Sequence, residues 1–560
     1  MTATPPKLSS VALQLLDVLR EFGVDTIFGI PGGAISALYA ATLHRRDIRL
    51  VTAKHETSAA FMAMGYSVAT GRPGVVLTTA GPGITNALTG LASAYYEGVP
   101  VIMIAGEVPR AAFGRGALQE GSSASFDAVS VLRPFTKFSA MISHPGPAAA
   151  VLRKALATAF SGRRGPAFLS LPLDVASTPI AAQPIVGTVR SSFEVDGDGA
   201  RRALEWLSNA KRPMILAGAG SRDATSRRAL RRMASLFNCP VAVTTKGKGV
   251  FPEDHPLYLG VLGFGGHESV TEYLREGVDV LLAIGSGLND FTTNAWTPML
   301  RATKAFIQID IDSAQLGKNY PIDLGLVGPA DAVIGRMLEY RIDERTVREP
   351  PARPMLKTQE PTPSPHGLLT TADVALAMNE VCPGDSIFTA DMGEHLAIAL
   401  HYLHVREAGD FFTSLGFGSM GSGIGSAIGY QFGCPDRRAY ALCGDGGFLM
   451  YGSELATAVQ HSIGTTFVII NDSRLNMVHH GMRDLYGETP DFSSAPVDFA
   501  ALANSMGADG RIVRDRATLV QGLVEPTSGP RVLDVRVDAD VRLGGSQRNA
   551  ALRQFGADDG

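Results

Sequence analysis

The stretch "CGDGGFLMYGSELATAVQHSIGTTFVIINDS", residues 443–473, decides the fold prediction. It continues a strand-like run, "RRAYALC", has helical spacing of apolar residues in its middle, and contains a second strand-like run, "TTFVII". A strand, a helix and a strand of this length form the unit that joins neighbouring parallel strands. Asp445 and Asp472 then follow the carboxyl ends of those two strands, the edge of an open α/β sheet at which ligands bind.

Glycines surround the first of these aspartates. Gly444, Gly446 and Gly447 allow backbone N–H groups to approach an anion at the start of the following helix. Asp445 and Asp472 would repel a phosphate unless a divalent cation lay between them, and such oxygen ligands suit Mg²⁺. A tight turn and the start of a loop are the alternative, but the spacing and the shared sheet edge favour a metal–phosphate site.

The whole chain restricts the class of protein. Its 560 residues suffice for about three or four domains. With 45% apolar and 19% charged residues it can bury several cores, and a net charge of −4 does not indicate nucleic-acid binding. Four cysteines without metal-ligand spacing fit a reducing cytoplasm. We expect no signal peptide at the start and no membrane span, because no apolar run approaches about 18 residues.

Buried-strand patterns alternate with helical ones almost throughout, as in "VPVIMIAG", "VDVLLAIGSG" and "GTTFVIIND". This alternation predicts an α/β protein with three doubly wound parallel-sheet domains. Proline-rich and irregular stretches mark the boundaries. The predicted parts are residues 1–185, 193–345, a proline-rich linker 346–366, 367–540 and a C-terminal tail 541–560.

The Gly-Asp-Gly and Asn-Asp pair resembles the diphosphate-binding motif of thiamine diphosphate (ThDP) enzymes. Residues 53–110 resemble the pyrimidine-binding domain of the acetolactate (acetohydroxyacid) synthases nearly position for position. "IFGIPGGAISALY", "TTKGKGVFPEDHPLYLGVLG" and "FTSLGFGSMGSGIGSAIG" resemble further segments of that family, in its order. The likeness extends over about residues 1–535 and implies a pyrimidine-binding, a central and a diphosphate-binding domain.

The resemblance assigns the metal site and the diphosphate loop. It implies that Asp445, Asp472 and the backbone carbonyl of Arg474 hold Mg²⁺. By spacing, the second side-chain ligand is Asp472 rather than Asn471. A second diphosphate loop and one further residue are also implied. These cofactor-binding residues are Gly393, Glu394, His395 and Met477. The family often has Gln where Glu394 stands, so we expect backbone contacts to matter more there than this side chain.

The resemblance also assigns the residues around the cofactor's rings. Glu56 matches the glutamate that hydrogen-bonds the pyrimidine and drives its tautomeric shift, a role that an apolar setting favours. Met420 matches the side chain that bends the cofactor, and the backbone of Gly418 and Met420 holds the pyrimidine. Pro82 and Asn86 are expected to line the cofactor from the first domain.

Four positions concern the substrate. Gly32 and Gln119 match residues that contact substrate and intermediate. Leu118 stands where the family has Phe, and Gly481 stands where the biosynthetic members have a Trp that shapes the acceptor pocket. Because Trp is among the largest apolar side chains, both departures predict a larger pocket and bulkier 2-oxo acids.

Two adjacent histidines, His479 and His480, lie near this pocket in the sequence. They can act as proton donors to a developing alkoxide, or they can be ordinary loop histidines. Composition does not separate the two interpretations.

The implied function is a ThDP- and Mg²⁺-dependent carboligase: it decarboxylates a 2-oxo acid and couples the enamine to a second carbonyl compound, giving an acetolactate-type or acyloin product. Plain decarboxylation, acyl transfer and a catalytically silent regulatory paralogue remain alternatives. Residues 285–296 lack the family's FAD-associated segment, so we expect no FAD. The resemblance implies a homodimer or homotetramer with active sites between subunits, no nucleic-acid or membrane partner, and a cytoplasmic location.

Overall fold

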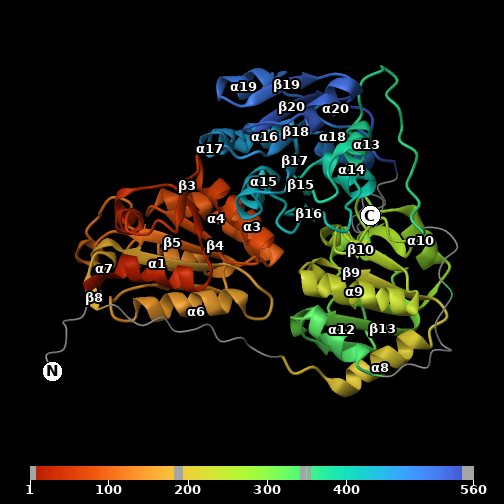
Figure 1. Cartoon of the computed structure of the whole chain (residues 1–560), viewed down its shortest axis with the longest axis horizontal. Coiled ribbons are helices and arrows are strands. Elements are labelled where there is room, and N and C mark those ends of the chain that lie inside the picture. The colour runs from red at the N-terminus through yellow and green to blue at the C-terminus, as the bar shows by residue number, and fades with distance from the viewer. Residues whose placement is uncertain (1–7, 182–192, 341–348, 350–354, 545–560) are drawn as a thin grey trace.

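The computed structural model describes residues 8–181, 193–340, 349 and 355–544. Within them the chain forms three domains, each built on a six-stranded parallel sheet with helices on its faces (Figure 1). The predicted fold class is therefore confirmed. The predicted boundaries near residues 185–193 and 345 lie largely outside the described residues, as does most of the tail, so the domain limits stay predictions. Residues 355–366 of the predicted linker form no helix or strand.

The N-terminal domain has buried, apolar strands flanked by helices, as its sequence pattern predicts. Its sheet order is β3 (Arg49–Thr52), β2 (Thr26–Gly29), β4 (Gly74–Thr78), β5 (Val101–Glu107), β7 (Ala167–Pro172) and β6 (Phe138–Met141). A short antiparallel pair joins β1 (Leu8–Ser10) to β8 (Pro179–Ala181). The helices are α1 (Val11–Glu21), α2 (Ser36–Thr42), α3 (Glu56–Thr70), α4 (Pro82–Glu97), α5 (Ala128–Leu132), α6 (Ala148–Phe160) and α7 (Leu173–Ala176).

The central domain has a different strand order. Counted within the domain it is 3-2-1-4-5-6, the order of dinucleotide-binding doubly wound sheets. Its strands in that spatial order are β11 (Tyr258–Leu262), β10 (Val241–Thr244), β9 (Pro213–Ala217), β12 (Val278–Ile284), β13 (Ala302–Asp310) and β14 (Leu324–Val327). Its helices are α8 (Gly197–Ser208), α9 (Ala224–Phe237), α10 (Glu268–Arg275), α11 (Asp290–Thr293) and α12 (Ala330–Leu338).

The C-terminal domain repeats the strand order of the N-terminal domain, 2-1-3-4-6-5 when strands are counted within each domain. Its strands are β16 (Asp410–Phe412), β15 (Ile387–Ala390), β17 (Ala439–Gly444), β18 (Thr466–Asn471), β20 (Arg531–Arg536) and β19 (Asp509–Val513). Its helices are α13 (Thr371–Val381), α14 (Glu394–Tyr402), α15 (Ser422–Gly433), α16 (Asp445–Tyr451), α17 (Leu455–Gln460), α18 (Asn476–Tyr486), α19 (Phe499–Ser505) and α20 (Arg516–Val524).

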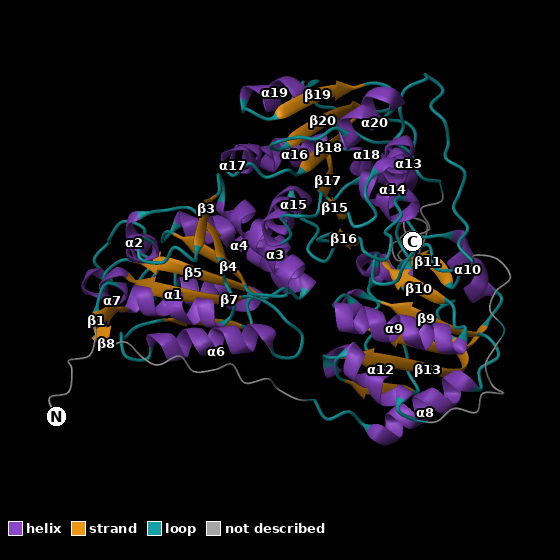
Figure 2. Ribbon diagram, in the orientation of Figure 1, coloured by secondary structure: helices purple, strands orange, loops and turns teal. Residues whose placement is uncertain are grey.

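The N-terminal and C-terminal domains share one hydrophobic core through α3 and α15, which lie side by side in Figure 2. Glycines allow this close approach. A Cβ on Gly65 of α3 would lie 2.1 Å from the Ser426 carbonyl oxygen, and a Cβ on Gly429 of α15 would lie 1.9 Å from that of Met62. The helices are therefore in backbone contact, and the relative position of the two domains depends on that contact.

Among the described residues, no helix combines the length and the apolar character that a membrane crossing needs.

Candidate active site

Asp445 and Asp472 directly follow two hydrogen-bonded neighbours, β17 and β18. The Asp445 carboxylate accepts hydrogen bonds from the backbone N–H groups of Gly446 at 2.6 Å and Ser473 at 2.7 Å. The side chain of Asn471 points elsewhere: its amide donates to Asp534 at 2.8 Å and to the Val497 carbonyl at 3.2 Å. The structure thus brings Asp445 next to the turn that carries Asp472, whereas the Asn471 side chain forms hydrogen bonds within the C-terminal domain.

The electrostatics of this pair fit a cation. Burial raises the pKa of Asp472 to about 7, and the nearby charge of Asp445 adds to the effect. Burial also raises the pKa of Asp445. Asp472 accepts hydrogen bonds from the Arg474 N–H at 3.0 Å and from the Asn476 amide at 2.6 Å. Two neighbouring carboxyls with raised pKa values are stabilised in their ionised form by a divalent cation between them.

The remaining ligands cannot all be acidic or aromatic-nitrogen side chains. No group of three or more His, Cys, Asp or Glu in the described part of the chain is arranged to hold a metal ion. The guanidinium of Arg474 donates hydrogen bonds to the Ala539 carbonyl at 2.6 Å and to Asp540 at 2.8 Å. Because a guanidinium has no acceptor atom, the backbone carbonyl of Arg474 is the group that can bind a metal ion. Mg²⁺ suits such a site, because it commonly takes one or two carboxylates, waters and substrate phosphates.

The second predicted diphosphate loop, Gly393–His395, lies at the start of α14 beside the glycine-rich turn. A Cβ on Gly444 would lie 3.3 Å from the His395 ring. Burial lowers the pKa of His395 to about 4, so its ring is neutral at pH 7. Its Nε2 is buried and has no hydrogen-bond partner among the described residues. A buried polar atom without a partner beside a glycine-rich turn fits a site for a polar ligand.

Glu394 is directed to a different partner. Both of its carboxylate oxygens lie 2.9 Å from Nδ1 of His480, whose side chain is buried on α18. The Glu394 carboxylate is therefore paired with His480. This pairing is consistent with the expectation that the backbone groups of this loop matter more for binding a diphosphate than the Glu394 side chain does.

Sequence reasoning missed one central carboxylate of this cluster, Asp391. It follows β15, is fully buried, and accepts hydrogen bonds from the N–H groups of Gly421 at 2.6 Å and Gly423 at 3.2 Å. Burial raises the pKa of the Asp391 carboxyl to about 6. These bonds hold the turn that carries Met420 and Gly418, the latter in the left-handed region at φ 72°. The available signal was its place directly after the short run "SIFTA", residues 386–390, much as Asp445 follows a strand-like run.

The N-terminal domain contributes a second cluster, centred on Glu56. This residue begins α3 and is buried, and its Oε2 accepts a hydrogen bond from the Asn86 amide at 3.0 Å. Pro82 begins α4, and a Cβ on the next residue, Gly83, would lie 3.6 Å from Oε1 of Glu56. Asn86 is the one described residue that donates a hydrogen bond to the Glu56 side chain, so Oε1 is available to a ligand.

Gly32 and Gln119 belong to the same cluster, joined through Thr79. A Cβ on Gly32 would lie 2.5 Å from the Thr79 hydroxyl oxygen, and that hydroxyl donates to Oε1 of Gln119 at 3.2 Å. Gln119 has a positive φ of 65°, uncommon for a residue other than glycine. Leu118 beside it is 87% exposed on the single chain.

One short helix separates the two clusters within a chain. Asp445 begins α16, and Tyr451 ends it with its ring 5.8 Å from that of His55, the residue before Glu56. Glu56 and Asp445 of one chain thus lie toward opposite ends of α16. The sequence predicts one helix across residues 448–462, whereas the structure has α16, a 3₁₀ turn (Gly452–Glu454) and α17.

A cavity of about 700 Å³ lies between the central domain, α14, α18 and residues 542–544. Gly481, His480 and Met477 all line it, and a Cβ on Gly481 would meet no atom within 4 Å. His479 does not line this cavity, although the sequence groups it with His480. Gln119 and Leu118, predicted to share a pocket with Gly481, lie in the other domain's cluster of the same chain.

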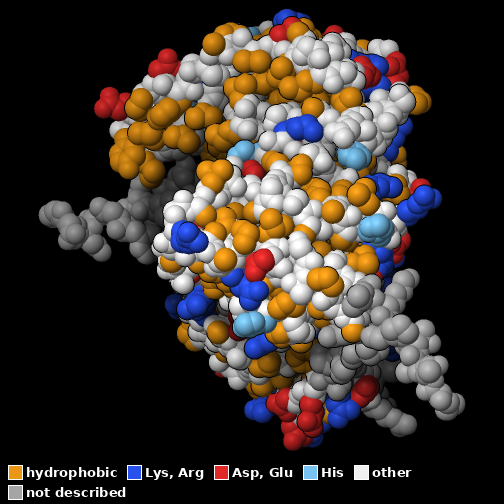
Figure 3. All heavy atoms as spheres, turned by 90° about the vertical axis from the view of Figure 1, so that its left-hand side faces the viewer, with side chains coloured by type: hydrophobic (Ala, Val, Ile, Leu, Met, Phe, Trp, Pro, Cys, Tyr) orange, Lys and Arg blue, Asp and Glu red, His pale blue; other side chains and the backbone are white. Residues whose placement is uncertain are grey.

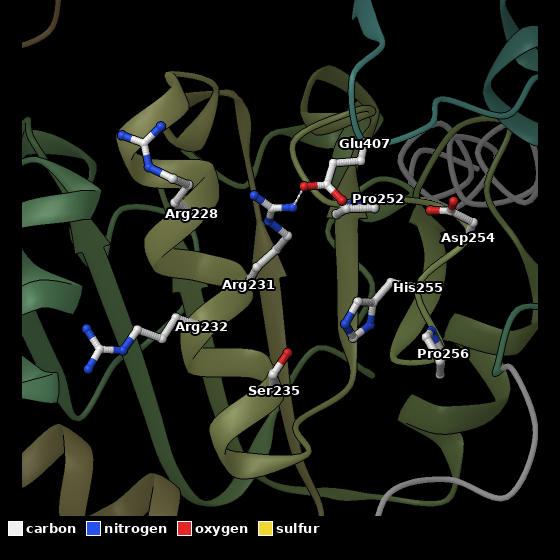
Figure 4. Close-up of a pocket in the computed structure, with 9 residues that line it drawn as sticks. All are labelled: Arg228, Arg231, Arg232, Ser235, Pro252, Asp254, His255, Pro256 and Glu407. Carbon is white, nitrogen blue, oxygen red and sulfur yellow. Dashed lines mark ion pairs between the residues drawn. The ribbon is translucent and has the colours of Figure 1, made fainter. Parts of the chain in front are cut away.

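A second cavity, of about 540 Å³, lies where α9 of the central domain meets the C-terminal domain. Arg231 forms an ion pair with Glu407 there, while the side chains of Arg228 and Arg232 extend away from His255 (Figure 4). The neighbouring Arg227 also bonds the C-terminal domain, at Asp410 and the Gly409 carbonyl. Arg227 and Arg231 thus join the two domains, and we assign this cavity no part in catalysis.

Comparison with known proteins agrees with this arrangement of two half-sites. Three family models match: the thiamine pyrophosphate enzyme N-terminal TPP binding domain over residues 9–130, the central domain over 200–337, and the C-terminal TPP binding domain over 391–535. The chain belongs to the thiamine pyrophosphate enzymes. The two TPP-binding models contain the Glu56 cluster and the Asp445 cluster respectively, so thiamine diphosphate is the cofactor that these domains bind.

Individual relatives show which members of this family the chain is similar to. The chain is 33% identical to an acetolactate synthase large subunit of Parasynechococcus marenigrum, over 97% of this chain and 89% of the relative. It is 33% identical to an acetolactate synthase of Arthrospira platensis, over 94% of both. It is 30% identical to the acetolactate synthase isozyme 2 large subunit of Escherichia coli, over 94% of this chain and 95% of the relative. The chain is therefore an acetolactate synthase-like, ThDP-dependent enzyme.

Proposed function

We propose that this enzyme is a Mg²⁺-dependent carboligase that decarboxylates a 2-oxo acid and joins the remaining acyl unit to a second carbonyl compound. The observation that supports the proposal best is the pairing of two half-sites in TPP-binding domains: buried Glu56 with a free Oε1, and Asp445 beside Asp472. Asp445, Asp472 and the Arg474 carbonyl would hold Mg²⁺ and, through it, the diphosphate. When bound, thiamine diphosphate would supply the carbanion and the electron sink that decarboxylation of a 2-oxo acid requires.

The residues of the chain prepare that chemistry. Asn86 fixes one oxygen of the buried Glu56 side chain, and the other oxygen would share a proton with the cofactor's pyrimidine. Gly418 and Met420 would hold the pyrimidine, and the hydrogen bonds that Asp391 accepts from the Gly421 and Gly423 N–H groups keep their turn in place. Gly32 and Gln119 would contact the substrate, with Thr79 orienting the Gln119 amide.

We further propose that the substrate pocket accepts bulky 2-oxo acids, such as aromatic or branched ones. The support is Gly481 on the wall of a cavity of about 700 Å³, with open space where a side chain would begin. His480 lines the same cavity and is held by Glu394, so it can deliver a proton to a developing alkoxide. His479, off this cavity wall, is the weaker candidate for that step.

A homodimer or homotetramer would complete the site by bringing the Glu56 cluster of one chain to the Asp445 cluster of another. Large apolar side chains are exposed on or near the elements that carry the clusters: Tyr96 on α4, Phe417 near Met420, and Leu449 and Met450 on α16. Figure 3 shows apolar side chains gathered in patches on one face of the molecule. Several relatives are named large subunits, which supports subunit association.

Two further expectations belong to this proposal. Four cysteines without a disulfide fit the reducing cytoplasm. The expectation that the central domain works without FAD rests on the sequence of residues 285–296 alone, and spectra of the purified enzyme will test it.

Mass spectrometry of reaction products tests the proposed reaction. The purified enzyme with ThDP and Mg²⁺ would receive pyruvate, 2-oxobutyrate, a branched 2-oxo acid, phenylpyruvate and indolepyruvate, singly and in pairs. Products that retain both carbon skeletons minus CO₂ are expected. Aldehyde and CO₂ alone would indicate a decarboxylase, transfer to another acceptor would indicate an acyl transferase, and no turnover with ThDP bound would indicate a silent paralogue.

A further inference from the structure

Glu454 of the C-terminal domain reaches into the N-terminal domain, about 400 positions earlier in the sequence. Its Oε1 accepts hydrogen bonds from the backbone N–H groups of Lys54 at 2.8 Å and His55 at 2.9 Å. Its Oε2 accepts a hydrogen bond from the Thr457 hydroxyl at 2.8 Å. The Glu454 side chain is completely buried.

The two amides that it binds belong to the last residues before α3, and Glu56 is the first residue of that helix. Backbone N–H groups in such a place need an acceptor, and Glu454 serves both. On the other side, His55 caps the helix by accepting the Thr57 N–H at its Nδ1, 3.1 Å away. A single carboxylate from another domain, that of Glu454, thus holds the backbone of the two residues that precede Glu56.

The hydrogen bonds to Glu454 partly offset the burial of its carboxyl group. Burial raises the pKa of Glu454, while the hydrogen bonds from Thr457, Lys54 and His55 act in the opposite direction. Three donors to one carboxylate offset much of the free energy that burying the charge costs. The carboxylate is also held by its own element, because Glu454 closes the 3₁₀ turn that interrupts the predicted long helix.

Resting on the proposed function, we propose that Glu454 is a positioning residue for Glu56. It does not touch the cofactor or the substrate, and it acts by fixing the backbone from which the Glu56 carboxyl reaches the cofactor's pyrimidine. Small displacements of a proton-sharing group are costly, since such groups must lie within hydrogen-bond reach of the atom that they serve. Asp445 lies at the other end of α16. A change of Glu454 should therefore leave the hydrogen bonds around Asp445, and with them the proposed Mg²⁺ and diphosphate site, intact.

The test uses full-length Glu454→Gln and Glu454→Ala with ThDP and Mg²⁺ bound, and measures exchange of the cofactor's C2 proton by NMR. We expect exchange and kcat to fall about tenfold in the Gln variant and about 100-fold in the Ala variant, the range for residues that orient a reacting group. The KM for the 2-oxo acid and the affinities for ThDP and Mg²⁺ should change by less than about threefold, since those contacts are elsewhere.

Asp279→Asn is the matched control. Asp279 also binds two successive backbone amides, Lys211 at 2.7 Å and Arg212 at 2.9 Å, but in the central domain. It should lose comparable thermal stability and leave C2 exchange unchanged. The proposal is overturned if the Glu454 variants exchange as fast as wild type, or if exchange falls only in proportion to ThDP and Mg²⁺ affinity. Where Glu454→Ala does not fold, Glu454→Gln alone decides.

Glu56→Gln, measured in parallel, separates this proposal from the proposed function. Slow exchange in Glu56→Gln with normal exchange in the Glu454 variants removes only the positioning role. Normal exchange in Glu56→Gln removes the role of Glu56 itself, and the positioning proposal with it.

Discussion

Gly481→Trp tests whether an open pocket sets the substrate preference of this enzyme. Gly481 lies on α18 at the wall of a cavity of about 700 Å³, and a Cβ there would meet nothing within 4 Å. An indole can therefore enter the cavity without displacing the backbone. Since Gly costs up to about 1 kcal/mol in a helix relative to good helix formers, the substitution should leave the melting temperature equal or slightly raised.

The magnitude follows from what the indole removes. Each methylene-sized group that a hydrophobic pocket accepts or refuses is worth about 1–3 kcal/mol, or about 10–200-fold in kcat/KM. An indole in the cavity should exclude at least the outer part of an aromatic or branched side chain. We expect kcat/KM for the preferred bulky 2-oxo acid to fall at least about 100-fold, while that for pyruvate changes by less than about threefold.

The assay measures kcat/KM for pyruvate and for the bulky acid with the wild type, Gly481→Ala and Gly481→Trp. Gly481→Ala adds one methyl group to open space and should change the ratio by less than about threefold. An unchanged ratio in a well-folded Gly481→Trp variant would show that this cavity does not receive the substrate. A large fall in melting temperature would show instead that the space at Gly481 is not open.

Four further predictions concern other parts of the site and fold. Glu56→Gln should abolish C2 proton exchange while ThDP stays bound, because an amide cannot share the proton; NMR exchange measures this, and normal exchange would contradict it. Asp472→Ala should weaken Mg²⁺ and ThDP binding together, which calorimetry measures, and intact affinities would show that the ligand set is wrong. In the wild type, the Asp472 pKa of about 7 means that Mg²⁺ affinity should decline as the pH falls below 7, up to about tenfold per pH unit, whereas a flat profile from pH 6 to 8 would contradict it. Gly429→Ala should destabilise the fold by at least about 1–3 kcal/mol, because its Cβ would lie 1.9 Å from the Met62 carbonyl; an unchanged chemical-denaturation midpoint would refute the backbone contact.

Matched controls separate these effects from general damage. Asn471→Asp keeps the side-chain volume beside Asp472 but replaces the amide that donates to Asp534 with a carboxylate, so it should lower stability more than Mg²⁺ affinity. Gly433→Ala, at the end of α15, would bring its Cβ within 2.8 Å of the side chain of Thr70 rather than of a backbone atom. It should therefore cost less than Gly429→Ala, because a side chain can move aside more readily than a helix backbone.

Local patterns of the sequence were enough to predict the α/β class and the edge at which Asp445 and Asp472 lie. Buried parallel strands are short apolar runs, and the residues that follow them must lie at the carboxyl edge, whatever the rest of the chain does. The motif around Asp445 and the matching segment around Glu56 carried the family assignment for the same reason: each is continuous in sequence.

The contacts between distant segments were decided by the tertiary structure. Asp391 is central to its cluster only because folding brings Gly421 and Gly423 over it, and Glu394 meets His480 of α18, which lies 86 positions later in the chain. The separation of His479 from His480 likewise depends on which face of α18 meets the cavity.

The break in the predicted helix over residues 448–462 has the same origin. Its apolar spacing continues across the 3₁₀ turn, so periodicity alone cannot find the interruption. The turn places Glu454 where two amides of another domain need an acceptor, and that need arises from residues about 400 positions away. Sequence by itself determined the strands, their order along the chain and the chemistry at their ends, because these depend on neighbouring residues. Tertiary structure alone decided which of these ends meet and what holds them, because such contacts join residues whose distance in the chain carries no local signal.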